Sequence, residues 1–147
     1  MSASRNVPTL LVDLGGTNVR FGVADPSRKH PLLADSIRRY RVADHDSLVS
    51  TATQYLADTG LEVKRAIIAA AGRIVDGETV KVTNNPWAIS AHHTAEALKL
   101  ERVHLVNDFA AQSMAVTLLQ AEDLVDVGTV ARPVIGDQDA RAFAIVG

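Results

Sequence analysis

The sequence predicts an α/β fold in which a mixed sheet is covered by helices. Short apolar runs that end at glycine or polar turn residues recur along the chain, as buried strands do. The first three runs follow one another without an intervening helix, whereas the later ones alternate with segments of helical periodicity. Hydrophobic residues make up 47% of the 147 residues, which is enough for one core.

The first two strands are expected on either side of a glycine turn. Residues 9–12 form an uninterrupted apolar run, typical of a buried strand, that stops at Asp13 and the pair Gly15–Gly16. Alternating apolar residues at 19–23 then predict a second strand. Strand, glycine turn and strand is therefore the expected local geometry.

A third strand is expected at residues 32–42, and a helix follows it. The helix is expected at residues 47–59, where apolar residues recur at helical spacing. Asp44 or Asp46 is expected to cap its start, and Gly60 to end it.

The residue pattern in the middle of the chain predicts a strand, a hairpin and a second helix. Residues 66–72 form a buried strand pattern, and the pair Asp76–Gly77 is a hairpin signal before a returning strand at 79–83. A loop is expected at 84–87, and a serine-capped helix at 90–99.

The last part of the chain repeats the pattern of a strand and a helix. Residues 102–106 form a strand pattern that ends at Asn107–Asp108, and a helix is expected at 109–119. An irregular segment at 125–139 precedes a final apolar strand at 142–147.

The glycine turn is the first candidate site. Paired glycines suit a turn that needs positive φ, and they let a ligand approach backbone N–H groups that can form an anion-binding nest. Thr17 adds a hydroxyl donor, and Asp13 could hold a hydrated Mg²⁺ beside a phosphate. The same residues also fit an ordinary hairpin turn with a capping aspartate. Neither a dinucleotide fingerprint nor a P-loop is present.

The second candidate site is the pair Asn107–Asp108, where a strand meets a helix. Ligands of open α/β sheets gather at the carboxyl ends of strands. If the two strands are parallel and close, Asp13 and Asp108 face one cleft from different loops. One carboxylate near Mg²⁺-phosphate and another near an acceptor hydroxyl is the arrangement of phosphoryl transfer. Asp108 fits equally well as an N-cap.

The composition excludes several classes of protein. Lys and Arg number 15 against 17 Asp and Glu, and no basic stripe is present, which disfavours nucleic acid as a partner. The absence of cysteine excludes disulfides and thiolate metal sites. No apolar run has the length of a membrane helix, and the first eight residues lack the apolar core of a signal peptide, so no membrane association and a cytoplasmic location are expected.

Three motifs together resemble one family. They are LVDLGGTN (residues 11–18), TNNPWAIS (83–90) and VNDFAAQ (106–112), and in this order and spacing they look like bacterial glucokinases, the ATP-dependent glucose 6-phosphotransferases of the hexokinase and actin-like ATPase superfamily. The resemblance extends from about residue 9 to residue 147. It implies a ribonuclease-H-like (actin-like ATPase) mixed sheet with flanking helices.

The resemblance also implies the roles of individual residues. Asn107 and Asp108 would bind glucose, with Asp108 as the general base on its 6-hydroxyl. Asp13 would assist Mg²⁺ through water. The ATP phosphates would be surrounded by Val12, Asp13, Leu14, Gly15, Gly16 and Thr17.

Members of that family are longer and have two domains. Residues 1–118 are therefore expected to be the small N-terminal domain, and residues 119–147 the connection and the first strand of a truncated large domain. The chain alone is expected to be inactive, and the full-length protein to be a homodimer. A kinase for another hexose or an amino sugar, or a non-catalytic sugar- or nucleotide-binding regulatory domain, are the alternatives.

Overall fold

The structure, a computed structural model, describes residues 7–116, 118–119, 121–123, 125 and 128–129. The chain divides into two compact units, Met1–Asp108 and Phe109–Gly147. No helix among the described residues is long and apolar enough to cross a membrane. The strand expected at 142–147 lies outside the described residues. The domain boundary expected at residue 118 stays a prediction.

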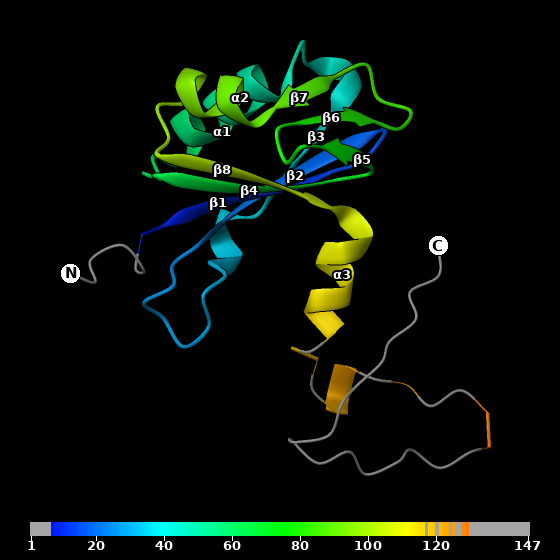
Figure 1. Cartoon of the computed structure of the whole chain (residues 1–147). Helices are drawn as coiled ribbons and strands as arrows, with labels where there is room; N and C mark the ends of the chain where they lie inside the picture. Colours follow the sequence, from blue (N-terminus) through cyan, green and yellow to red (C-terminus); the bar gives the residue numbers. More distant parts are fainter. Residues whose placement is uncertain (1–6, 117, 120, 124, 126–127, 130–147) are drawn as a thin grey trace. The chain divides into compact units, whose positions relative to one another are not determined.

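The first unit is built on a mixed five-stranded sheet, as the sequence predicts (Figure 1). The strand order is β3-β2-β1-β4-β8. β1 and β4 are parallel, as are β4 and β8, whereas β2 is antiparallel to both β1 and β3. The strands are β1 (Thr9–Leu14), β2 (Asn18–Ala24), β3 (Arg38–Arg41), β4 (Arg65–Ala70) and β8 (Arg102–Asn107).

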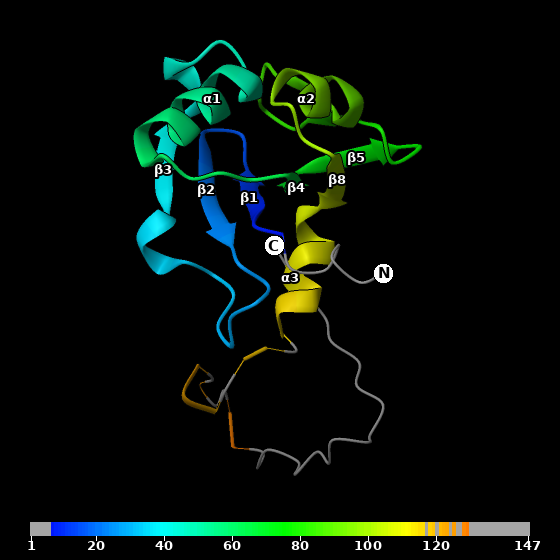
Figure 2. The same ribbon diagram turned by 90° about the vertical axis from the view of Figure 1, so that its left-hand side faces the viewer.

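The two helices of this unit lie on one face of the sheet, as Figure 2 shows for α1 (Leu48–Thr59) and α2 (Ala91–Ala97). Side chains alternate along a strand, so every second residue of β1 points to this covered face and is buried. Tyr55 of α1 is fully buried there and stacks on Phe21 of β2, with ring centroids 5.1 Å apart. Such aromatic stacking ties the helix to the sheet beyond its simple area of contact.

A second sheet, of which the sequence predicts only the β5–β6 hairpin, packs beside the first. Its three antiparallel strands are β5 (Gly72–Val75), β6 (Thr79–Val82) and β7 (Ala88–Ser90). The predicted hairpin turn between β5 and β6 is confirmed, because Asp76 and Gly77 both have positive φ, as a type I′ turn requires. The short strand β7 was not predicted, since three residues are too few for a clear alternation.

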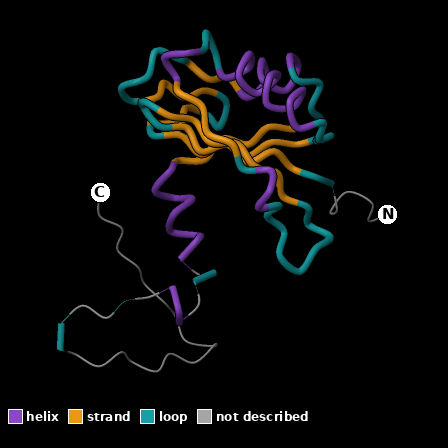
Figure 3. The backbone as a smooth tube through the Cα atoms, turned by 180° about the vertical axis from the view of Figure 1, so that it is seen from behind, coloured by secondary structure: helices purple, strands orange, loops and turns teal. Residues whose placement is uncertain are grey.

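The third strand is much shorter than residues 32–42. Only β3 is a strand, and a 3₁₀ helix occupies Ala34–Ser36 beside the edge of β2 that β3 leaves unpaired (Figures 1 and 3). The Ser36 hydroxyl accepts a hydrogen bond from the Val23 N–H at 2.8 Å and donates to the Leu33 carbonyl. Serine side chains compete in this way with strand hydrogen bonds, which explains why the strand pattern was interrupted.

Two helix ends also differ from expectation. Ser47, and not Asp44 or Asp46, caps α1, through a reciprocal capping box with Ser50. Gly60 ends α1 in the left-handed conformation, as predicted. The helix expected at 90–99 begins after the Ser90 cap but already ends at Ala97.

Candidate active site

The glycine turn, defined here as residues 14–18, joins β1 to β2 at the edge of an open pocket of about 290 Å³. The Gly15 N–H donates to the Asn18 carbonyl at 3.0 Å, which closes the turn. The pocket is lined by Asp13, Gly15, Gly16, Thr17, Asn18 and Arg20. Four of these six were expected around the phosphates.

The two glycines are not required by backbone conformation, contrary to expectation. Neither Gly15 nor Gly16 is among the residues with positive φ. Gly16 is required by space, because a Cβ there would lie 3.0 Å from the Asn84 carbonyl oxygen and 3.2 Å from that of Thr83. At Gly15 a Cβ would meet only the Asn18 carbonyl, at an ordinary 3.6 Å. The fold therefore leaves the space beside Gly15 open.

Asp13 forms an ion pair that is not among the sequence predictions. Arg20 lies directly opposite Asp13 in the β1–β2 ladder, and its guanidinium donates to the Asp13 carboxylate at 3.0 Å. Both side chains are 57% exposed, and ion pairs of this kind contribute about 0–1 kcal/mol. The available signal was the hairpin itself, since a turn at residues 15–17 places position 20 opposite position 13.

The second group lies at the end of β8. Asn107 is the last residue of β8, and its side-chain N–H donates to the Gly72 carbonyl at 3.1 Å. Asp108 is the first residue of α3 (Asp108–Val116). A carboxylate at the start of a helix also complements the positive end of the helix dipole. Asp108 therefore has a structural role in addition to any chemical role.

The sheet brings the two groups to the same edge. Asp13 pairs with Ala69 of β4, and Ala69 pairs with Val106 of β8. Because neighbouring strands are about 4.8 Å apart, two strand spacings separate the backbones of Asp13 and Val106 by about 10 Å. Asn107 and Asp108 follow directly. The strands are thus parallel and close, which is the condition that the shared cleft requires.

The glycine turn presents groups that could hold a phosphate. Gly15 admits close approach, Thr17 carries a hydroxyl, and Arg20 adds a cation. Proteins commonly bind Mg²⁺ through one or two carboxylates together with substrate phosphates, and Asp13 can supply one. No group of three or more His, Asp or Glu side chains among the described residues forms a metal site of its own. The residues therefore fit Mg²⁺ carried by a phosphate ligand.

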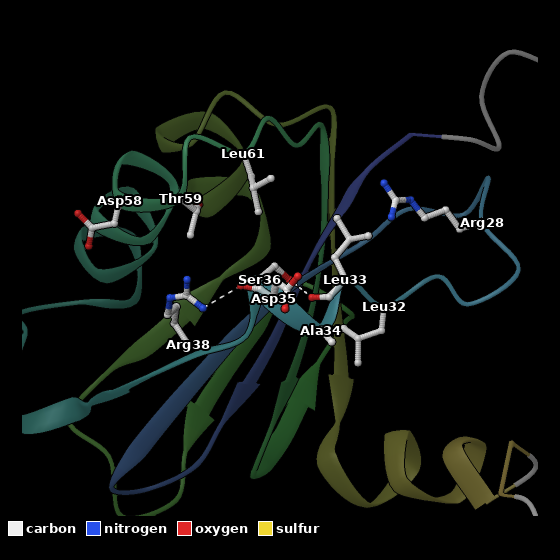
Figure 4. A pocket seen from close by; sticks show the side chains of 10 residues that line it. All are labelled: Arg28, Leu32, Leu33, Ala34, Asp35, Ser36, Arg38, Asp58, Thr59 and Leu61. Atoms are coloured by element: carbon white, nitrogen blue, oxygen red, sulfur yellow. Dashed lines mark hydrogen bonds between the residues drawn. The ribbon is translucent and has the colours of Figure 1, made fainter.

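A larger pocket lies elsewhere, between the segment after β2 and the end of α1 (Figure 4). Its volume is about 440 Å³, and Leu32, Leu33 and Leu61 give it an apolar lining. Arg38 at its rim donates to the Asp35 and Ile37 carbonyls. None of the predicted site residues lines it.

Comparison with known proteins places the chain among glucokinases. Two glucokinases of Stenotrophomonas maltophilia, from strains K279a and R551-3, are 46% identical to it over 147 residues. A glucokinase of Xanthomonas euvesicatoria pv. vesicatoria is 45% identical over 141 residues, or 95% of this chain and 42% of that relative. The Stenotrophomonas matches cover all of this chain but 43% of each relative, so the chain spans less than half of their length.

Solved structures agree. A glucokinase from an Antarctic psychrotroph aligns with a TM-score of 0.68 and 31% identity, over 78% of this chain and 36% of that one. A ROK family glucokinase from Streptomyces griseus, solved with glucose and AMPPNP, aligns with a TM-score of 0.56 and 26% identity, over 72% and 35%. These likenesses confirm the predicted actin-like ATPase fold class. A model of the glucokinase family matches residues 10–147, and the chain therefore belongs to the glucokinase family.

Proposed function

We propose that this chain is the N-terminal part of an ATP-dependent glucose kinase that makes glucose 6-phosphate. The observation that carries the proposal is the placement of the glycine turn and Asp108 at one edge of a sheet, one strand apart, in a member of the glucokinase family. The Streptomyces griseus neighbour was solved with glucose and AMPPNP, which supports both a sugar and a nucleotide as ligands.

The glycine turn would hold the ATP phosphates. Val12 and Leu14 are buried in the sheet and fix the end of β1, so that Gly15, Gly16 and Thr17 are presented to the pocket. The space beside Gly15 lets oxygen atoms of a phosphate approach the backbone closely. Asp13 would hold Mg²⁺ through water, and the metal would supply neutralisation of phosphate charge when bound.

Asn107 and Asp108 would act on the sugar. The carboxamide of Asn107 is oriented by its hydrogen bond to the Gly72 carbonyl, and in this position it would bind a glucose hydroxyl. Asp108 would accept the proton of the 6-hydroxyl as its oxygen attacks the γ-phosphorus in line and the bond to ADP breaks. General-base assistance of this kind contributes a factor of about 10²–10⁴, and positioning of the reactants supplies most of the remainder.

The proposal also extends to the cellular location, the pathway and the oligomeric state of the complete protein. A glucose kinase of this family would work in the cytoplasm, at the entry to glycolysis, and the complete protein would be a homodimer. Glucose and ATP would be its partners.

Catalysis can be tested by completing the enzyme. The test uses a fusion protein, called the joined protein, in which this chain is followed by the part of the Stenotrophomonas maltophilia glucokinase that lies beyond the matched residues. We expect ATP-dependent phosphorylation of glucose, with mannose and glucosamine as comparison substrates. A folded joined protein that phosphorylates one of the comparison sugars and not glucose would contradict the proposal.

A further inference from the structure

Asn85 is a buried polar side chain that lies directly beneath the glycine turn. It is only 9% exposed, and both ends of its carboxamide are used. The side-chain N–H donates to the Gly15 carbonyl at 2.9 Å, across 70 residues of sequence. The side-chain oxygen accepts from the Trp87 N–H at 2.8 Å. Asn85 thus links the glycine turn to the segment before β7.

The backbone around Asn85 is held against the same turn. The Asn84 carbonyl fills the space beside Gly16, as described above. The Thr83 N–H donates to the Ala71 carbonyl at 2.7 Å, and the Ala71 N–H donates to the Leu14 carbonyl at 3.3 Å. Residues 83–85 are therefore anchored to the sheet independently of Asn85, so its side chain reaches the turn from a fixed base.

We propose that Asn85 is a positioning residue of the glycine turn, which sets the turn's shape for the phosphates of the nucleotide. This inference rests on the proposed function. A peptide unit is rigid and planar, and in the trans form its C=O and N–H point in opposite directions. The structure has no cis peptide bond among the described residues. A Gly15 carbonyl held toward Asn85 therefore fixes the direction of the Gly16 N–H, which points the opposite way.

A turn with two successive glycines is flexible, so it needs an anchoring hydrogen bond more than other turns do. Glycine has the widest choice of backbone conformations, so two in succession leave the direction of their N–H groups weakly determined. Donors that are fixed before the ligand arrives bind charge better, because no reorganisation is needed at that moment. Asn85 is suited to this part because a carboxamide both donates and accepts. Aspartate keeps the acceptor for Trp87 but loses the donor for Gly15.

The test compares two variants with a control in the 147-residue chain. Asn85→Ala removes both hydrogen bonds, and Asn85→Asp keeps the size of the side chain and the acceptor for Trp87. Ser36→Ala is the matched control: it also removes buried hydrogen bonds of the same sheet, but it acts on Val23, which pairs with Leu10 at the far end of the β1–β2 ladder. Amide hydrogen exchange and Mg-ATP titration, both followed by NMR, give the readouts, with a glucose titration in parallel.

The Gly15 N–H bond to the Asn18 carbonyl closes the turn, so exchange of this amide reports how often the turn opens. We expect it to exchange about tenfold faster in both Asn85 variants, because the turn loses the buried hydrogen bond that holds its Gly15 carbonyl. The dissociation constant for Mg-ATP is expected to rise by a factor of about ten in Asn85→Ala and by more in Asn85→Asp, whose added negative charge also repels the phosphates, while that for glucose stays unchanged. Ser36→Ala is expected to change none of the three. A general loss of stability would not produce this selectivity.

Unchanged Gly15 exchange in Asn85→Asp, or unchanged Mg-ATP affinity in a folded Asn85 variant, overturns the inference. Equal changes in Ser36→Ala overturn it as well, because they would mark a general effect of weakening the sheet. If Mg-ATP perturbs no amide of the glycine turn in the wild-type chain, the proposed nucleotide site is contradicted instead. The exchange rates still decide in that case whether Asn85 holds the turn.

Discussion

At the residue scale, Gly15 and Gly16 stand side by side for different reasons. Gly16 is enclosed by the carbonyls of Thr83 and Asn84, so a methyl group there would press on backbone that cannot move aside easily. Gly15 borders open space, and the fold alone would accept alanine. The structural role of Gly16 and the proposed ligand-binding role of Gly15 can therefore be separated by experiment.

Gly16→Ala is expected to lower the free energy of unfolding by about 1–3 kcal/mol, the usual cost of overpacking. Gly15→Ala is expected to leave that free energy nearly unchanged but to weaken Mg-ATP binding, since its methyl group would occupy the space of a phosphate. Urea unfolding and Mg-ATP titration of the two variants would check this. The assignment fails if Gly15→Ala binds Mg-ATP as the wild type does.

Asp108→Asn in the joined protein is expected to lower kcat by about 10²–10⁴ while the KM for glucose changes little. An amide keeps much of the hydrogen bonding to the sugar, but it cannot accept the hydroxyl proton. Steady-state kinetics, with circular dichroism as a check of folding, would measure both effects. Near-normal turnover would exclude Asp108 as the base.

The two aspartates were predictable from sequence, whereas their neighbours were not. Asp13 and Asp108 each follow an apolar strand, and the carboxyl ends of parallel strands share an edge. Arg20 and Asn85 reach the same place through cross-strand register and a contact across 70 residues. The pairing of Arg20 with Asp13 could be inferred only from the register of the predicted hairpin, whereas the contact of Asn85 depends on the finished fold.

At the element scale, one aromatic side chain makes two distinct contacts that tie α1 to the rest of the unit. The Tyr55 hydroxyl donates to the Ser36 carbonyl at 2.9 Å, while its ring stacks on Phe21. The same hydrogen bond secures the 3₁₀ helix that interrupts the predicted third strand. The Ser36 side chain explains the shortened strand, and its backbone carbonyl gives α1 a further contact, which apolar alternation in the sequence does not indicate.

Tyr55→Phe is expected to lower the free energy of unfolding by about 0.5–1.5 kcal/mol near neutral pH, through the lost hydrogen bond. Burial raises the pKa of Tyr55 above its ordinary value of 10.0. The folded chain therefore favours the neutral phenol. The stability that comes from this preference is present below pH 10 and is lost as the pH rises through the raised pKa of the folded state. Urea unfolding from pH 8 to 11 should show a shallower alkaline decline in the variant. Burial also raises the pKa of Tyr40, so part of the decline should persist.

At the scale of the whole molecule, the chain matches only 42–43% of the length of its glucokinase relatives. We expect the 147-residue chain alone to show no ATP-dependent phosphorylation of glucose, because enclosure of both substrates and exclusion of water need a second wall. A coupled assay at high protein concentration measures this. Activity above that of the Asp108→Asn chain would refute it.

The chain alone is also expected to self-associate. On the sheet face away from α1 and α2, Leu32, Ile37 and Ile67 are 49%, 45% and 39% exposed. Apolar surface gathered in this way favours association. Light scattering over a range of concentrations would follow it, with Ile67→Lys as a variant expected to reduce it. A monodisperse monomer at millimolar concentration would disprove this expectation.

The single strand β4 between β1 and β8 acts as a spacer of constant width. Hydrogen bonds on both of its sides keep its neighbours about 10 Å apart, and no hinge within the sheet can shorten that interval. The sheet therefore fixes the backbone positions of Asp13 and Asp108 relative to each other. In the proposed reaction, phosphate and hydroxyl would therefore approach each other through movement of the ligands, and not through movement of this sheet.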